Sequence, residues 1–453
     1  MLARRYLSLS LLSASFLAGC GSSDSGSSAA PATSAGGQSG SGGAAGMGMS
    51  GAGGSTSTGG AGGSDATGGA GGTSAGGSDA AGGTGTSGTG GTGAAAGTGG
   101  SGGFKTAKHA APPVVTKYGG PVLVNPQVVT VTYAGFAYKD QVEAYGDWIV
   151  GSDWLTTWGP EYGIGPATHL AKVSLPDAAP AAITDEAFQA FLTAKLADGT
   201  LPAPSGNPND YLYVFYFPKS TKYTQSTGSV SCKAFGGFHN GVALTKYRVA
   251  YAVVNDCGGG FPELQITASH EIAEAATDPM FNNNPAYQTA PGLSPFLNIG
   301  SEVGDWCEDL PDVAVKDPVS GFYAARIWSN AATKIDADPC IPAAPGPMFN
   351  VSPSATNFVG ILPGGSVDIK LTGWSTEAIG DWTLKAQTSA YSGFNITTKL
   401  SATTINNGQV VTATLTAPAS APKASFGSVS IFSTYMGHTH EWVIGVNTPQ
   451  LET

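Results

Sequence analysis

The segment ITASHEIAEAATDP, residues 266–279, contains the side chains most capable of chemistry. In a helix, His270 and Glu274 lie one turn apart on one face, roughly 5–6 Å apart at Cβ, so both can reach one metal ion. Glu271 lies beside that face, and in the HExxH motif this glutamate is the general base. Because Glu274 stands where that motif has its second histidine, the segment predicts an HExxE metal site with Glu271 as the catalytic residue.

The exchange of histidine for glutamate is compatible with metal binding. A carboxylate oxygen is a competent zinc ligand at about 2.0–2.2 Å, so zinc is the expected ion. The added negative charge makes the site more tolerant of harder ions such as manganese. An alternative remains open, in which His270 and Glu274 form an exposed helical ion pair worth a few tenths of a kcal/mol and Glu271 is merely solvated.

A metal ion needs further protein ligands, and the segment NIGSEVGDWCEDL offers two carboxylates. Glu302 is the first candidate for the third ligand and Asp305 the second. His239, in FGGFHNG, is a further candidate as a ligand or as a donor to the transition state. Pro279 disfavours helix at Asp278, so that carboxylate is expected at the helix end, where it would orient a ligand.

The elements that must position these residues follow from hydrophobic periodicity. Strands are expected over 126–136, 209–218 and 247–256, and helices over 140–165 and 184–199. Thr184 is the expected N-cap of the second helix, and Gly199 its end. Strands that alternate with helices predict an α+β or α/β domain, spanning 104–345.

Residues 346–453 have a different sequence pattern. Short stretches such as GGSVDIKLTGW, QVVTATLTAP and HEWVIGV are separated by turn signals, including NNG at 406–408. This spacing predicts an all-β sandwich of immunoglobulin or fibronectin type. His438 and His440 alternate on one expected strand, where they either bind a metal or form ordinary polar surface. A calcium loop at DPMFNNNP is a third possibility, although its spacing does not match an EF-hand.

The amino-terminal residues indicate export. Residues 1–19 have two arginines, a short apolar run and small residues before Cys20, as in a bacterial lipoprotein signal peptide with its lipobox. A plain signal peptide is the alternative. Cys20 is the expected lipidation site, and the glycine that follows it favours the outer membrane, with the protein facing the periplasm or the cell surface. Residues 20–103 are rich in Gly, Ser and Ala and predict a disordered tether, whose root-mean-square span is roughly 50 Å.

Four further cysteines remain, Cys232, Cys257, Cys307 and Cys340, and an even number in an exported protein predicts two disulfides. Three pairings are possible. We favour Cys232 with Cys257 and Cys307 with Cys340, because each pair brackets one candidate site segment. A four-cysteine zinc site is the alternative, but no CxxC spacing supports it.

The charge balance excludes one class of partner. The net charge is −11, only 11% of the residues are charged, and the expected folded part contains no cluster of lysine and arginine. Nucleic acid is therefore not an expected partner. The expected partners are a membrane, reached through the lipid, and a polypeptide or a cell-wall or surface ligand.

SHEIAEAATDP followed by SEVGDWC resembles secreted bacterial zincin-like proteins that carry SHExxEAxTDP and then E[IV]GDxC. A more distant resemblance is to the plant EXORDIUM, or phosphate-induced, family. The similarity extends to VTVTYAGF, WIVGSDWLTTWGPEYGIG, CKAFGGFHNG and YAVVND, and so covers residues 128–340. It implies a zincin-like domain in which His270, Glu271 and Glu274 act together with Glu302 and Asp305.

Two functional hypotheses follow. The first is an exported, lipid-anchored metallohydrolase of peptidase-like type. The second is a non-catalytic cell-surface, adhesion or cell-wall-binding lipoprotein that keeps a structural metal. A metal whose ligands leave no open position would favour the second hypothesis.

Overall fold

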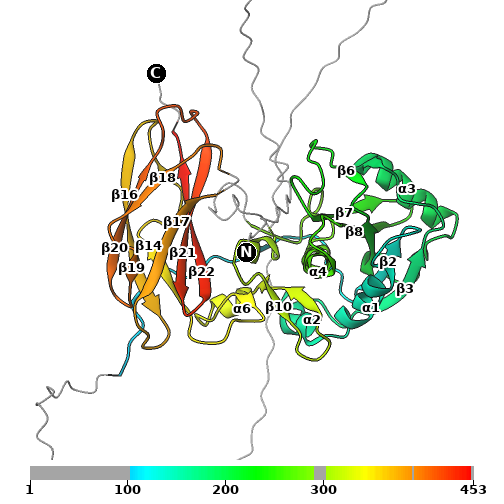
Figure 1. Ribbon diagram of the computed structural model, residues 1–453, viewed down its shortest axis with the longest axis horizontal. Coiled ribbons are helices and arrows are strands. Elements are labelled where there is room, and N and C mark those ends of the chain that lie inside the picture. Colours follow the sequence, from blue (N-terminus) through cyan, green and yellow to red (C-terminus); the bar gives the residue numbers. More distant parts are fainter. Residues whose placement is uncertain (1–102, 290–301, 390–391, 450–453) are drawn as a thin grey trace, which may run out of the picture. The chain divides into compact units, whose positions relative to one another are not determined.

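The computed structural model describes residues 103–289, 302–389 and 392–449 (Figure 1). The expected signal peptide, Cys20 and the tether up to residue 102 lie outside the described residues. Among the described residues, no helix combines the length and the apolar character that crossing a bilayer requires.

The first folded region is built on a five-stranded sheet with the order β3-β2-β5-β8-β7. Its first four strands are mutually parallel, and the edge strand β7 runs antiparallel to β8. The strands are β2 (Gln127–Thr132), β3 (Thr168–Ser174), β5 (Tyr211–Phe217), β7 (Gly237–Ala243) and β8 (Arg248–Asn255). The strands predicted at 126–136, 209–218 and 247–256 are thereby confirmed. Strands buried on both faces read as continuous apolar runs, which explains YLYVFYF in β5.

Helices cover both faces of this sheet (Figure 1). On one face, α1 (Lys139–Ile149), α2 (Asp153–Trp158) and α4 (Phe261–Thr277) share an apolar cluster with alternate residues of β2, β5 and β8. On the other face, α3 (Asp185–Ala197) packs on the remaining residues of these strands. The Thr184 hydroxyl caps α3 by accepting from the Ala187 amide, and Gly199, at φ +78°, follows its end, both as predicted.

Shorter elements complete this region. They are the 3-10 helices η1 (Gly159–Tyr162) and η2 (Pro208–Asp210), the helices α5 (Asp305–Glu308) and α6 (Asn330–Thr333), and four strand pairs. The pairs are β1 (Thr116–Lys117) with β9 (Tyr287–Gln288), β4 (Ala182–Thr184) with β6 (Lys222–Thr224), β10 (Ala314–Lys316) with β11 (Tyr323–Ala325), and β12 (Ile327–Trp328) with β13 (Cys340–Ile341).

From residue 349 the described elements are all strands, arranged in two sheets. The four-stranded sheet contains β14 (Phe349–Pro353), β16 (Ser366–Ser375), β20 (Val410–Thr416) and β18 (Thr397–Leu400), in that order. The five-stranded sheet contains β15 (Val359–Gly360), β22 (His438–Asn447), β21 (Phe426–Tyr435), β17 (Trp382–Thr388) and β19 (Thr404–Ile405). Alternate residues of both sheets form one apolar cluster, which is the arrangement of a β-sandwich.

The pattern of elements agrees with the broad prediction. Helices and strands alternate in the first region, and an all-β region follows it. The NNG turn is also present, with Gly408 at φ +85° and the Gln409 amide donating to the Asn406 carbonyl. Glycine suits this turn because other residues rarely adopt such a φ.

Candidate metal centre

Helix α4 carries the centre of the site. Pro262 lies in its first turn, and the helix ends at Thr277, one residue before the Asp278 that precedes Pro279. Alanine fills much of its surface and allows close packing against the sheet. His270 and Glu274 are 5% and 0% exposed, so the alternative of an exposed ion pair is wrong.

Three side chains form a first ligand group: His270, Glu274 and Asp305, all of them buried. His270 Nε2 lies 3.1 Å from Glu274 Oε1 and 3.7 Å from Asp305 Oδ1. Ligands at about 2.1 Å from a tetrahedral zinc ion are separated from one another by about 3.4 Å. The spacing of this group is therefore that of ligands around one ion.

A second group consists of His239, Glu271 and Glu274. His239 Nδ1, from the edge strand β7, lies 3.6 Å from Glu271 Oε2 and 3.5 Å from Glu274 Oε2. Glu274 thus turns one oxygen toward each group. The structure places His239, expected only as an outlying candidate, at the centre of the site.

Glu302 and Asp305 have different positions. The Glu302 backbone amide donates to Asp305 Oδ2 at 3.1 Å, which helps to fix Asp305 beside His270. The Glu302 side chain instead lies at His239, with Oε1 3.3 Å from Nε2. Asp305 therefore groups with His270 and Glu274. Glu302 instead faces Nε2 of His239, the ring nitrogen that is directed away from Glu271 and Glu274.

Asp278 supports the site from the end of α4. Its backbone carbonyl lies 3.2 Å from His239 Nε2, and a carbonyl can only accept, so Nε2 carries the hydrogen. This leaves His239 Nδ1, the atom directed at Glu271 and Glu274, for a metal ion or a second proton. Asp278 Oδ1 accepts from the Ala286 amide at 2.8 Å and anchors the following loop. Asp278 therefore contacts His239 through its backbone carbonyl, whereas its carboxylate, which the sequence predicts to orient a ligand, holds the following loop.

Several polar atoms at the centre make no hydrogen bond within the described part of the chain. They are His270 Nε2, Glu271 Oε2 and both carboxylate oxygens of Glu274 and of Glu302. A buried polar atom without a partner destabilises a fold by about 1–3 kcal/mol. Several donor and acceptor atoms that make no hydrogen bond therefore converge at one place, and such an arrangement fits a bound cation.

Burial and mutual charge control proton binding here. Burial raises the pKa of Glu271 to about 7. Burial opposes ionisation of Glu274 too, but the charge of His270 and the contact with His239 lower its pKa to about 2. Burial also raises the pKa of Glu302 and Asp305. Glu274 is thus the carboxylate most strongly held in its charged, metal-binding form.

The two histidines show the opposite balance. Burial disfavours their charged forms, but the charge of Glu302 raises the pKa of His239, and that of Glu274 raises the pKa of His270, well above the ordinary value. In the absence of a cation the centre therefore takes up protons, which neutralise part of its negative charge.

Gly304 and Gly237 have no side chain, and the side chains of the centre occupy the space next to them. A Cβ on Gly304 would lie 2.8 Å from Glu274 Oε1 and 2.9 Å from His270 Cε1. A Cβ on Gly237, in β7, would lie 2.7 Å from Glu271 Oε1. Sequence reasoning did not single out either glycine, although Gly304 stands between the candidate ligands in SEVGDW.

Both favoured disulfides are confirmed: Cys232 pairs with Cys257, and Cys307 with Cys340. The first joins the segment before β7 to the segment before α4, and the second holds the segment that carries Asp305. Among the described residues, neither His438 nor His440 belongs to a group of three side chains that could hold a metal ion. The expected calcium loop at DPMFNNNP, residues 278–285, also contributes no residue to the groups found in the described ranges.

No family model matches the chain, and no curated protein matches it. Among solved structures, the chain is similar to the titin M3 domain, with 11% identity, 23% of this chain and 97% of that chain covered, and a TM-score of 0.16. It is also similar to a family 123 glycoside hydrolase from Clostridium perfringens, with 12% identity, 23% and 27% covered, and a TM-score of 0.16. Similarity at this level assigns neither a fold nor a function to the chain.

Proposed function

We propose that the chain is a zincin-like metallohydrolase that cleaves an amide bond in a polypeptide. The observation that carries the proposal is the first ligand group, with the Glu271 carboxyl next to it. His270, Glu274 and Asp305 hold one divalent ion, zinc first and manganese second. When bound, the ion would supply Lewis-acid polarisation of the substrate carbonyl.

The remaining steps belong to the chain's own residues. Glu271 accepts a proton from water as the water oxygen adds to the carbonyl carbon, and then returns that proton to the leaving amine. A pKa near 7 suits this exchange, because the same group must both accept and donate. Protonated His239, 3.6 Å from Glu271 through Nδ1, donates to the oxyanion that develops on the carbonyl oxygen.

The decisive variant is Glu271→Gln, which removes the base but keeps the shape of the side chain. We expect one metal ion per chain, measured by elemental analysis, in both the wild type and Glu271→Gln, and loss of peptide hydrolysis in the variant by at least about 100-fold. Glu274→Ala is the matched comparison and should lose the metal as well. Turnover in Glu271→Gln equal to that of the wild type would refute the mechanism.

The number of bound ions tests the assignment of the two groups. One ion per chain that remains bound in Glu271→Gln would support His270, Glu274 and Asp305 as the ligands. Two ions per chain, one of them lost in Glu271→Gln, would mean that His239, Glu271 and Glu274 hold an ion, and Glu271 would then be a ligand. Absence of metal after reconstitution with zinc and with manganese would remove both assignments.

A second function is favoured by burial. His239, Glu271, Glu274, Glu302 and Asp305 are each at most 2% exposed, which suits a structural ion with no open position. On this alternative the chain is a surface or cell-wall-binding protein whose metal stabilises the first region. Removal of the metal would then lower the melting temperature, while no hydrolytic assay would respond to the metal or to Glu271→Gln.

We further propose that the chain is exported and anchored to the outer membrane through a lipid on Cys20. The lipobox-like sequence before Cys20 supports this location, and the long Gly-rich segment that follows suits a tether.

A further inference from the structure

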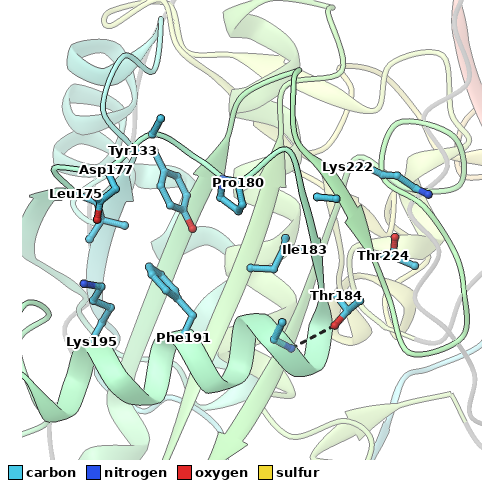
Figure 2. Close-up of a pocket in the computed structure, with 13 residues that line it drawn as sticks. Tyr133, Leu175, Asp177, Pro180, Ile183, Thr184, Phe191, Lys195, Lys222 and Thr224 are labelled. Carbon is cyan, nitrogen blue, oxygen red and sulfur yellow. Dashed lines mark hydrogen bonds between the residues drawn. The ribbon is translucent and has the colours of Figure 1, made fainter.

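A pocket of about 540 Å³ opens on the face of the sheet that α3 covers, and we call it the α3 pocket (Figure 2). Tyr133, Leu175 and Phe191 belong to the apolar cluster of this face, whereas α4 packs on the opposite face. The α3 pocket is therefore separate from the metal centre. The residues that line it are Tyr133, Leu175, Asp177, Ala178, Pro180, Ala182, Ile183, Thr184, Ala187, Phe191, Lys195, Lys222 and Thr224.

The topology of the sheet makes this a place where ligands bind. Tyr133 directly follows β2, Leu175 directly follows β3, and Lys222 begins the next strand after β5. The pocket thus lies at the carboxyl ends of the parallel strands β2 and β3, beside β6, the strand that follows β5 in the chain. In the sheet, β3 lies on one side of β2 and β5 lies on the other. The chain passes from β2 to β3 and then to β5, so the direction in which strands are added reverses at β2. In open α/β sheets, the crevice at such a reversal is the usual binding site.

Tyr133 supplies a buried polar group that is directed into the pocket (Figure 2). The residue is 3% exposed, and its hydroxyl has no hydrogen-bond partner in the described part of the protein. Burial raises its pKa, so the hydroxyl keeps its hydrogen at neutral pH. A buried hydroxyl without a partner destabilises the fold, and a ligand acceptor would remove that penalty.

The charges of the lining favour an anion. Lys195 and Lys222 line the pocket together with a single acidic residue, Asp177. Lys195 already lies 3.8 Å from Asp198, whereas no ion pair of Lys222 is found among the described residues. The remaining walls, including Ile183 and Phe191, are mainly apolar, and the volume is typical of small-molecule sites.

We propose that the α3 pocket binds a small organic carboxylate with an aromatic or branched apolar body. The carboxylate accepts a hydrogen bond from the Tyr133 hydroxyl, the positive charges of Lys195 and Lys222 on either side of the pocket attract it, and the apolar body packs on Ile183, Pro180 and Phe191. The α3 pocket and its ligand are independent of the function proposed for the metal centre.

The test uses 3-phenylpropanoate and, as an uncharged probe of similar shape, 3-phenylpropanol, titrated calorimetrically into the full-length protein. We expect the acid to bind at least tenfold more tightly than the alcohol, both with and without a metal chelator. Tyr133→Phe should weaken binding of the acid about tenfold or more, because a hydrogen bond to a charged group is lost. Lys222→Met should weaken it too, and Lys385→Met, an exposed lysine of the β-sandwich, should not.

The melting temperature distinguishes a Tyr133 hydroxyl that binds a ligand from one that stabilises the fold. Tyr133→Phe should leave the melting temperature unchanged or raise it, because the hydroxyl has no partner to lose. A lower melting temperature in Tyr133→Phe would assign the hydroxyl a structural role and overturn the proposal. Equal affinity for the acid and the alcohol, no binding of the acid at millimolar concentration, or an equal loss in Lys385→Met would overturn it as well.

Discussion

Among single residues, Glu274 is the one on which both ligand groups depend. Its Oε1 faces His270 at 3.1 Å and its Oε2 faces His239 at 3.5 Å. A histidine in its place, as in HExxH, would present only one ligating nitrogen to the centre. The carboxylate therefore joins a helix residue and an edge-strand residue in one centre.

Gly304 limits what can stand next to these ligands. In Gly304→Ala, the new Cβ would lie within 2.9 Å of both Glu274 and His270, so one of the two side chains must move. We expect the metal affinity, measured by chelator competition, to fall about 10–100-fold, in the range found when groups that orient ligands are lost. Gly151→Ala is the control, because no atom lies within 4 Å of its added Cβ, and it should bind metal as the wild type does.

The protonation of the centre predicts how stability depends on pH. Burial raises the pKa of Glu271 and of Asp278 to about 7, and His239 and His270 also have raised pKa values. A group with a raised pKa in the fold stabilises the protein below its unfolded pKa, and this contribution is lost as the pH rises through the folded pKa. We expect the melting temperature of the metal-free protein to fall between about pH 5 and pH 8.

Metal binding should reverse this trend, because the ligands must release their protons to bind a cation. The rise in melting temperature on adding zinc should therefore grow from pH 5 to pH 8, as measured by calorimetry. Since burial also raises the pKa of Glu441 to about 8, the comparison is best made in Glu441→Gln. A zinc effect that shrinks as the pH rises would contradict the proposed protonation.

Among the elements, two segments must meet to form each ligand group, and three must meet to form both. Helix α4 provides His270 and Glu274, strand β7 provides His239, and the start of α5 provides Asp305. The α5 segment has little regular structure of its own. It is held by the disulfide from Cys307 to Cys340 and by the Trp328 amide, which donates to the Val303 carbonyl at 2.8 Å.

This dependence predicts different effects for the two disulfides. Replacing Cys307 and Cys340 by serine should lower the free energy of unfolding by about 2–5 kcal/mol and also weaken metal binding, because Asp305 loses its anchor. The matched control replaces Cys232 and Cys257, which close a loop of similar length, with sequence separations of 25 and 33 residues. Chemical denaturation and zinc titration would measure the two effects separately. Equal losses of zinc affinity in the two double variants would show that the Cys307 bridge has no special role at the site.

For the whole molecule, the acidic net charge of −11 and the separate apolar cores describe a protein with a candidate metal centre in its first region and a β-sandwich after it. The proposed anchor at Cys20 sets where this molecule acts. A lipid anchor on Cys20, joined to a long Gly-rich segment, would keep the first region near a membrane without fixing its orientation.

Membrane attachment can be tested directly. Cys20→Ser should move the protein from the membrane fraction to the soluble fraction and abolish labelling by radioactive palmitate, because the acceptor sulfur is absent. Ser22→Ala is the control and should fractionate as the wild type does. Retention of Cys20→Ser in the membrane fraction would place the anchor elsewhere.

The sequence alone determined the features that depend on short-range spacing. The four-residue interval between His270 and Glu274, the N-cap at Thr184, the buried strands and the helix end before Pro279 all follow from local backbone geometry. The disulfide pairing was favoured among three possibilities because each pair brackets a site segment, and the structure confirmed it.

The tertiary structure alone decided which distant residues complete the centre. Glu302 and Asp305 are three residues apart, and only the fold shows that Asp305 lies at His270 while Glu302 lies at His239. His239 comes to the centre because β7 pairs antiparallel at the edge of the sheet, beside α4. The α3 pocket likewise arises where the ends of β2 and β3 meet α3 and β6, a relation that depends on strand order. Spacing along the chain fixes neighbours within one helix or strand, but contacts between elements depend on how the sheet is wound and packed.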